Sequence, residues 1–193
     1  MSVSAKPLLL VATSNAHKLA ELRLLLPEFD VQGFVAPGQP PEDGATYLEN
    51  ARIKARHARA HARADAWVAG EDSGIEAAAL GGRPGVASAR WAHEGVSALL
   101  EALWGETDRR VRYVSELVAI APGGEELRGT GTLEGTVSDT PRGSGGFGYD
   151  PIVVPLGETM TVAELGDAWK NEHSHRALAA RALAEELASR RAR

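Results

Sequence analysis

The sequence predicts an α/β fold built on one mixed β-sheet, in a single domain that spans residues 1–193. An apolar run over residues 8–12 ends at a polar turn, and the helical pattern that follows is typical of a strand leading into a helix. Strand patterns over residues 111–121 and 127–137 flank a Pro-Gly-Gly turn and predict an antiparallel hairpin. Because strands and helices do not alternate regularly, a mixed sheet is favoured over a doubly wound parallel one.

The elements of the first half follow from periodicity and from helix breakers. Four leucines at helical spacing predict a helix over residues 18–26, and Pro27 ends it. Residues 29–35 are expected to form a short strand, and the Pro- and Gly-rich residues 37–44 a loop. Apolar residues spaced by three and four, mostly alanines, predict a long helix over residues 46–64 with a buried small-residue stripe.

The second half contains the hairpin and shorter elements. The expected order is a strand, a Gly-rich loop, a helix, a short strand and an alanine-rich closing helix, over residues 66–70, 81–85, 96–103, 152–155 and 174–193. The first of these strands is expected to end at an acidic pair.

Composition excludes several classes of function. The 21 basic and 26 acidic residues give a net charge of -5, which argues against a general nucleic-acid or membrane binder. No signal peptide or membrane-spanning run is visible, so the protein is expected to be cytoplasmic. The chain has no cysteine, so any metal must be held by oxygen or imidazole. A row of arginines on the predicted long helix is interpreted as a solvated face: Arg52, Arg56, Arg59 and Arg63.

The turn after the first strand predicts an anion site. Thr13-Ser14-Asn15 precedes a helix N-terminus, where free N–H groups and the helix dipole favour negative charge. Lys18, one turn into the helix, adds a full positive charge, and a phosphate is the expected guest. The alternative is a capped helix with Ser14 or Asn15 as the N-cap.

An acidic pair is the second informative feature. Glu71-Asp72-Ser73-Gly74 is expected at a strand end, at the rim of the sheet, where open α/β folds place ligands. Since side chains alternate along a strand, only one of the two carboxylates is expected to face a given cleft. Carboxylates are natural ligands of Mg²⁺, which in turn is the natural partner of a polyphosphate. The alternative is an Asx-type turn without ligand.

Two further segments indicate nucleoside recognition. Phe147 is flanked by glycines, and an aromatic side chain on such a loop can stack on a planar base. The alternative is a tight turn with Phe147 and Tyr149 in the core. Lys170, His175 and Arg176 surround a predicted N-cap at Ser174, where the helix dipole disfavours cations, so these donors are expected to point at an anionic or carbonyl-bearing ligand.

These segments together resemble the family of inosine triphosphate pyrophosphatases, the Ham1-like house-cleaning enzymes. The ordered motifs are Thr-Ser-Asn-x-x-Lys, Asp-Ser-Gly with Leu-Gly-Gly-x-Pro-Gly-Val-x-Ser-Ala-Arg, Gly-Phe-Gly-Tyr-Asp-Pro and Lys-Asn-x-x-Ser-His-Arg, and they extend over nearly the whole chain. The resemblance implies an elongated, two-lobed fold around a curved mixed sheet, with the active site in the cleft between the lobes. It also implies a homodimer, Mg²⁺ as cofactor, and hydrolysis of noncanonical purine nucleoside triphosphates (ITP, dITP, XTP) to the monophosphate and pyrophosphate.

The resemblance also implies roles for individual residues. Asp72 would bind the metal and act as the base on water, Ser73 would contact substrate, and the second acidic ligand falls on Glu42, with Glu49 as a rival. The triphosphate would be cradled by Thr13, Ser14, Asn15, Ala16, His17 and Lys18. The base and sugar would be held by Phe147, Gly148, Tyr149 and Asp150, and the purine would be read by Lys170, His175 and Arg176.

This chain departs from the family pattern at two places. Glu71 stands where an aspartate is common, and the segment over residues 92–110 is shorter than usual, which bears on the local lobe and the dimer contact. Two other functions fit the same features: a related pyrophosphatase that selects modified pyrimidines or guanine lesions, and a regulatory protein that binds a nucleotide without cleaving it. A pure binder would not need the acidic pair and Glu42.

Overall fold

The computed structural model describes residues 5–38, 40–91 and 95–191. The predictions for residues 1–4, Gln39, 92–94 and the last two residues of the closing helix lie outside the described residues. One sheet of six strands has the order β2-β1-β3-β4-β5-β6. In chain order the strands are β1 (Leu8–Ala12), β2 (Asp30–Gly33), β3 (Trp67–Ala77), β4 (Arg110–Ile120), β5 (Glu126–Val137) and β6 (Val153–Pro155).

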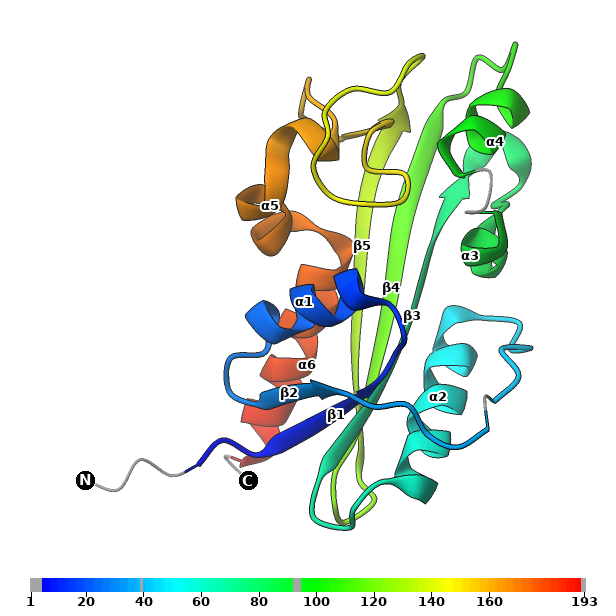
Figure 1. The fold of residues 1–193 in the computed structure, drawn as a ribbon. Helices are drawn as coiled ribbons and strands as arrows, with labels where there is room; N and C mark the ends of the chain where they lie inside the picture. The colour runs from blue at the N-terminus through cyan, green and yellow to red at the C-terminus, as the bar shows by residue number, and fades with distance from the viewer. Residues whose placement is uncertain (1–4, 39, 92–94, 192–193) are drawn as a thin grey trace.

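The sheet is mixed, as predicted. β1 is parallel to both β2 and β3, whereas β3, β4, β5 and β6 pair antiparallel. The predicted hairpin is confirmed as β4 and β5, and with β3 these long strands extend along the whole molecule (Figure 1). The open sheet and its flanking helices agree with the α/β fold expected from the sequence.

The prediction that the third strand ends before the acidic pair is wrong. β3 continues to Ala77, because β4 pairs with it over its whole length, from Val68 opposite Ile120 to Ala77 opposite Val111. β1 pairs with β3 only as far as Gly70. Glu71 and Asp72 therefore lie in the middle of a strand, at the point where the parallel neighbour stops.

The helices cover both faces of the sheet. They are α1 (Ala16–Leu25), α2 (Tyr47–His61), α3 (Ser88–Trp91), α4 (Gly95–Ala102), α5 (Val162–His173) and α6 (His175–Arg191), with short 3₁₀ helices over Ala78–Leu80 and Gly85–Ala87. Leu9 packs in a core with α1 and α6, while Leu10 packs in a second core with the alanines of α2. Adjacent residues of a strand point to opposite faces, so α1 and α6 cover one face and α2 the other (Figure 1). A third core, around Ile75 and Leu99, lies with α4 and α5 toward the other end of the long strands.

The alanine stripe predicted for α2 is confirmed, since Ala51, Ala55 and Ala58 are fully buried. Of the arginine row, Arg56 and Arg63 are exposed as expected. Arg52 is half-buried and binds Glu126 of β5, which also lies 3.6 Å from Arg56. None of the helices in the described ranges is long and apolar enough to cross a membrane.

Two glycines let α6 approach the sheet closely. A Cβ on Gly129 would lie 1.9 Å from the carbonyl oxygen of Ala179, and one on Gly131 would lie 2.0 Å from that of His175. No side chain fits in such a gap. This close contact brings the first turn of α6, with His175 and Arg176, against the middle of the sheet.

The sequence analysis did not predict α5. Its N-terminus has a capping box, in which the Thr161 side chain accepts from the Glu164 N–H and the Glu164 side chain accepts from the Thr161 N–H. Gly166, with φ of 79°, interrupts the helix after its first turn. A glycine inside a helical segment weakens the signal from which a helix is predicted.

Candidate active site

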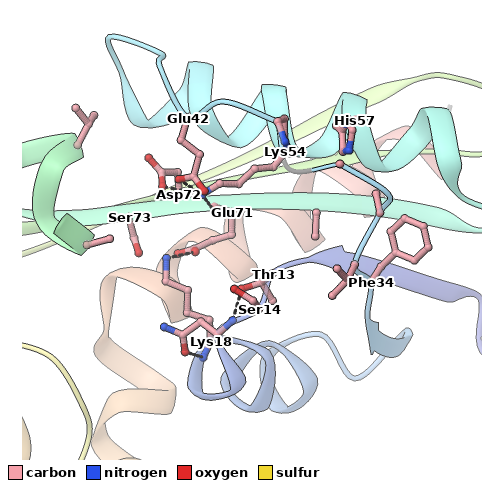
Figure 2. Close-up of a pocket in the computed structure, with 18 residues that line it drawn as sticks. Thr13, Ser14, Lys18, Phe34, Glu42, Lys54, His57, Glu71, Asp72 and Ser73 are labelled. Carbon is pink, nitrogen blue, oxygen red and sulfur yellow. Dashed lines mark hydrogen bonds and ion pairs between the residues drawn. The ribbon is translucent and has the colours of Figure 1, made fainter. Parts of the chain in front are cut away.

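A cavity of about 300 Å³ opens where β1 ends beside β3. Figure 2 shows its walls: the turn that begins α1, the loop after β2, one side of α2 and the middle of β3. The polar lining residues include Thr13, Ser14, Asn15, Lys18, Glu42, Lys54, His57, Glu71, Asp72 and Ser73. Two of the four segments singled out in the sequence, the turn and the acidic pair, therefore meet at one cavity.

The turn before α1 is internally bonded. Asn15 is the N-cap, since its Oδ1 accepts from the N–H groups of His17 (3.0 Å) and Lys18 (3.2 Å). The Thr13 hydroxyl accepts from the N–H of Asn15 at 3.1 Å. The capped-helix alternative is thus realised at Asn15, and a phosphate at this turn would have to compete with these contacts.

The two neighbouring carboxylates of β3 lie on opposite faces, as alternation along a strand requires. Glu71 accepts from Lys18 of α1 (2.7 Å) and from Arg176 of α6 (3.2 and 3.1 Å). Asp72 accepts instead from Asn50 (3.2 Å) and Lys54 (3.0 Å) of α2. Contrary to expectation, both carboxylates line the cavity, because it lies at the strand edge and not over one face.

Lys54 lies between two carboxylates (Figure 2). Its Nζ is 2.8 Å from Oε2 of Glu42 and 3.0 Å from Oδ1 of Asp72, and it donates to the carbonyl oxygen of Glu71 at 3.3 Å. Glu42 comes from the loop before α2, and Asp72 from the sheet. Three oxygen atoms from two separate elements thus surround one ammonium group.

Asn50 fixes the loop of Glu42 relative to Asp72. Its Oδ1 accepts from the N–H of Gly44 at 2.9 Å, while its Nδ2 donates to Asp72. Glu49, the rival of Glu42 as a metal ligand, is engaged elsewhere, since its Oε2 accepts from the N–H groups of Ala45 and Thr46 in a capping box. The structure therefore brings Glu42, and not Glu49, together with Asp72.

Burial and charge shift the two carboxylates of β3 in opposite directions. Burial raises the pKa of Asp72 above its ordinary value, and the Lys54 ammonium only partly opposes this. Burial would also raise the pKa of Glu71, but Lys18 and Arg176 outweigh it and hold that pKa well below its usual range. The pKa of Lys54 is raised: burial lowers it, but Asp72 and Glu42 more than compensate, so the amine stays protonated.

A buried ion network continues behind Glu71. Arg176, 2% exposed, donates to Glu71, to Glu21 of α1 and to the Ser73 hydroxyl. Lys170, 5% exposed, binds Glu21 at 2.8 Å and Asp150 at 2.7 Å. The cations expected to point at a ligand therefore point at carboxylates of the protein.

Phe147 lies half-buried at the edge of this network. The His17 ring stacks on it, with centroids 5.1 Å apart and planes 18° apart. The Nζ of Lys170 is 4.6 Å from the ring centroid and the Cζ of Arg176 is 5.6 Å from it. The ring that the sequence assigns to base stacking is thus covered by a protein ring.

Asp150 shapes the loop that carries Phe147. Its Oδ2 accepts from the Phe147 N–H at 2.9 Å, and Gly146 at φ of 70° permits this, since a Cβ there would lie 2.1 Å from that oxygen. Gly148 is exposed in the same loop. Tyr149 is 5% exposed and belongs to the core around Ile75 and Leu99, which is the structural alternative considered for it.

His175 is buried and stacks on Tyr113, with ring centroids 4.6 Å apart. Burial, aided by the charge of Arg176, brings the pKa of His175 well below its ordinary value, so the ring is neutral. Its Nδ1 has no hydrogen-bond partner in the structure. Ser174 ends α5, and its hydroxyl accepts from the Ala177 N–H, as expected of a cap at this point.

The polar residues of the site that were not identified from the sequence include Lys54, Asn50, Glu21 and the lining residue His57. Lys54 and Asn50 are four residues apart on α2 and share a face, but so do the arginines of that helix. Glu21 is three residues after Lys18 on α1, a spacing that common surface pairs also have. No local signal separates these residues from solvated ones.

The donor set fits a hard cation. Lys54 already holds a positive charge between Asp72 and Glu42, so the pair is arranged around a cation. In the described parts of the chain no cluster of three or more His, Asp or Glu side chains could hold a metal. Mg²⁺ usually takes one or two carboxylates, waters and substrate phosphates, so two carboxylates suit a metal that is shared with a phosphate ligand.

Comparison with known proteins shows the family to which this chain belongs. The model of the Ham1 family matches residues 9–186. A dITP/XTP pyrophosphatase of Bdellovibrio bacteriovorus is 43% identical over 191 residues, covering 92% of this chain and 96% of the relative. The solved Ham1 protein of Staphylococcus aureus superposes with a TM-score of 0.82 at 32% identity, over 94% of this chain and 98% of that one. That of Coxiella burnetii gives 0.82 at 33% identity, over 95% and 99%. The resemblance found in the sequence motifs is confirmed, and the chain belongs to the Ham1 family.

Proposed function

We propose that this protein is a pyrophosphohydrolase that converts noncanonical purine nucleoside triphosphates, namely ITP, dITP and XTP, into the monophosphate and pyrophosphate. The relative from Bdellovibrio bacteriovorus, named a dITP/XTP pyrophosphatase, matches along nearly its whole length. The observation that carries the proposal is the pair of Asp72 and Glu42, held around a cation at a cavity that also contains Lys18. A protein that only binds nucleotide has no need of this pair.

The reaction transfers the nucleotidyl group, the nucleoside with its α-phosphate, to water. The water oxygen bonds to the α-phosphorus, the bond from that phosphorus to the α–β bridging oxygen breaks, and pyrophosphate leaves. Asp72, at the cavity beside Ser73, is the proposed base that takes the proton of the water. Thr13, Ser14, Asn15, Ala16, His17 and Lys18 form the triphosphate end of the site, with Ser73 beside it.

Mg²⁺ is the proposed cofactor, with Asp72 and Glu42 as its protein ligands. When bound, it would neutralise phosphate charge that accumulates during the reaction. Lys18 is bound to Glu71 at 2.7 Å, and a triphosphate oxygen offers it a second partner on the cavity side.

Base recognition is proposed at Phe147 and its neighbours, Gly148, Tyr149 and Asp150. A purine would replace His17 on the Phe147 ring, an exchange of one stacked ring for another. Lys170, His175 and Arg176 would provide the polar reading of the base. Hypoxanthine and xanthine carry an acceptor oxygen at C6, which suits cationic donors, whereas adenine carries an amino donor there. Lys170 is bound to Asp150 and Arg176 to Glu71, so both side chains are already held in place before the base binds.

The test is a panel of ITP, dITP, XTP, GTP and ATP, assayed with Mg²⁺ for pyrophosphate release. We expect the first three to be hydrolysed with the highest kcat/KM. Release of inorganic phosphate in place of pyrophosphate, or binding without hydrolysis, would reject the proposal in favour of another triphosphatase or of a nucleotide-binding regulator. Preference for modified pyrimidines or guanine lesions would indicate the related pyrophosphatase.

The assembly and place of action are part of the same proposal. A homodimer in the cytoplasm agrees with the family resemblance and with substrates drawn from the nucleotide pool. Sedimentation equilibrium of the purified 20.4 kDa chain checks the dimer, which must appear at twice that mass.

A further inference from the structure

The Lys54 ammonium lies between the two carboxylates that the proposed function assigns to the metal. Its nitrogen lies within 3.3 Å of three oxygen atoms, from Glu42, from Asp72 and from the backbone of residue 71. The first two belong to the carboxylates that the proposed function assigns to Mg²⁺. An ammonium group and a divalent cation cannot share them, because both carry positive charge and both need the same lone pairs.

The backbone under Lys54 holds the amine in position. α2 packs on β3 at Gly70, where a Cβ would lie 2.2 Å from the carbonyl oxygen of Ala51 and 2.8 Å from the Cβ of Lys54. The Lys54 side chain is 14% exposed, so most of it is packed. Its helix is therefore fixed, and only the flexible stem can move the charge.

One partner of Lys54, Glu42, is far more exposed than the carboxylate that binds Lys18. Glu42 is 49% exposed and comes from a loop, so its bond to Lys54 is partly in water. Lys18 in contrast binds Glu71, which is 1% exposed and also bound by Arg176 and Ser115. The pair of Lys54 with Glu42 can be exchanged for another partner at lower cost than the Lys18 pair can, whereas the pair with Asp72, 9% exposed, is more buried.

We propose that Lys54 is a displaceable stand-in for the metal, which keeps divalent-cation affinity low until a triphosphate gives the ammonium another partner. This rests on the proposed function and adds a regulation of the same site. Metal and nucleotide then bind cooperatively, because each favours the arrangement in which Lys54 has left the two carboxylates. The protein without nucleotide therefore binds a divalent cation only weakly.

The first test measures Mn²⁺ binding without nucleotide, through the loss of the electron paramagnetic resonance signal of the free ion. Mn²⁺ suits carboxylate ligands as Mg²⁺ does. Lys54→Met should bind Mn²⁺ about tenfold more tightly than the wild type, because the fraction of sites free of the competing charge rises. Lys54→Arg, which keeps the charge, should bind no more tightly than the wild type.

Lys18→Met is the matched control. It also removes one positive charge from the same cavity, but from a lysine whose ion pair is with Glu71. Its effect on Mn²⁺ affinity should be clearly smaller than that of Lys54→Met. Equal gains from both variants would reduce the effect to net charge and overturn the proposal, as would unchanged or weaker binding in a folded Lys54→Met protein.

A second measurement uses the wild-type chain and holds even where Lys54→Met does not fold. Brief acetylation followed by mass spectrometry reports which amines are free of ion pairs. Saturating Mg²⁺ should increase the acetylation of Lys54 but not of Lys170, whose partners are Asp150 and Glu21. No increase at Lys54 would overturn the proposal. Pyrophosphate release by the wild type tests the proposed function separately, so either failure can be recognised alone.

Discussion

The two faces of β3 carry adjacent carboxylates and hold them in different ways. Glu71 is 1% exposed and is bound by Lys18, by two nitrogens of Arg176 and by the Ser115 hydroxyl. Asp72 is 9% exposed and is bound by one ammonium, that of Lys54, and one amide, that of Asn50. The pKa of Glu71 is lowered and that of Asp72 is raised.

This difference separates a supporting role from a reactive one. A carboxylate held by several buried partners, two of them cations, is fixed as an anion and connects the elements that supply those partners, here α1, β4 and α6. A carboxylate with one exchangeable cation, next to a cavity, can take a metal or a proton. Under the proposed function, neighbouring residues of one strand contribute stability on one face and chemistry on the other.

Asp72→Asn gives the largest expected effect. The change is nearly isosteric, so the fold should be retained, but it removes the charge that binds metal and accepts a proton. We expect kcat/KM for ITP to fall about a thousandfold or more, because several kcal/mol of charge stabilisation are lost. Pyrophosphate release measures this, with a melting curve as control. Turnover like that of the wild type would show that Asp72 is not the reactive carboxylate.

Glu71→Gln should mainly lower the free energy of unfolding, where Asp72→Asn lowers kcat/KM. It leaves Lys18 and Arg176 without their buried partner, and breaking a buried pair in this way typically costs about 3–5 kcal/mol. Urea denaturation followed by circular dichroism measures the loss. A variant with normal stability but no activity would show that Glu71 is reactive as well, which contradicts the division between the two faces.

Phe147→Ala tests whether the Glu71 face also meets the nucleotide. Stacking of a base on an aromatic ring is worth about 1–3 kcal/mol, so the affinity for ITP should fall accordingly. Calorimetry with ITP and Ca²⁺, to slow hydrolysis, measures the affinity. A large fall in melting temperature with unchanged affinity would instead assign Phe147 to packing against His17.

The smallest effect is expected from pH and His175. The pKa of His175 is lowered in the folded protein, so below about pH 6.5 the unfolded chain binds a proton that the folded chain does not. The free energy of unfolding therefore decreases as the pH decreases. Between pH 6.5 and 5 this amounts to at most about 2 kcal/mol, at 1.36 kcal/mol per pH unit. His175→Phe keeps the stack on Tyr113 and should flatten this dependence, measured by urea denaturation at each pH. An unchanged slope would assign the dependence to other groups.

The sequence predicted local structure well where residues close together in the chain determine it. The hairpin of β4 and β5, the alanine stripe of α2 and the N-cap at Asn15 are each determined by neighbours within a few residues. The end of β3 was predicted wrongly because polar residues after an apolar run normally end a strand. Here β4 pairs with them and provides buried partners for their side chains.

Pairing across the fold was not predictable. Arg176 was expected to address a ligand, but residues 105 and 155 positions earlier, Glu71 and Glu21, accept from it. Lys54 was not singled out at all, since a lysine on a polar helix face has the same local pattern whether it is solvated or faces a carboxylate.

The sequence by itself determined most of the elements, the motifs and through them the family, because capping, periodicity and turn chemistry act over short distances along the chain. The tertiary structure decided which charges meet. β1 ends at Ala12, opposite Gly70, and leaves the rest of this edge of β3 open. Gly129 and Gly131 let α6 bring Arg176 against Glu71. Electrostatic partners and burial depend on distances in space and not in sequence, so only the folded chain could separate the fixed carboxylate from the exchangeable one.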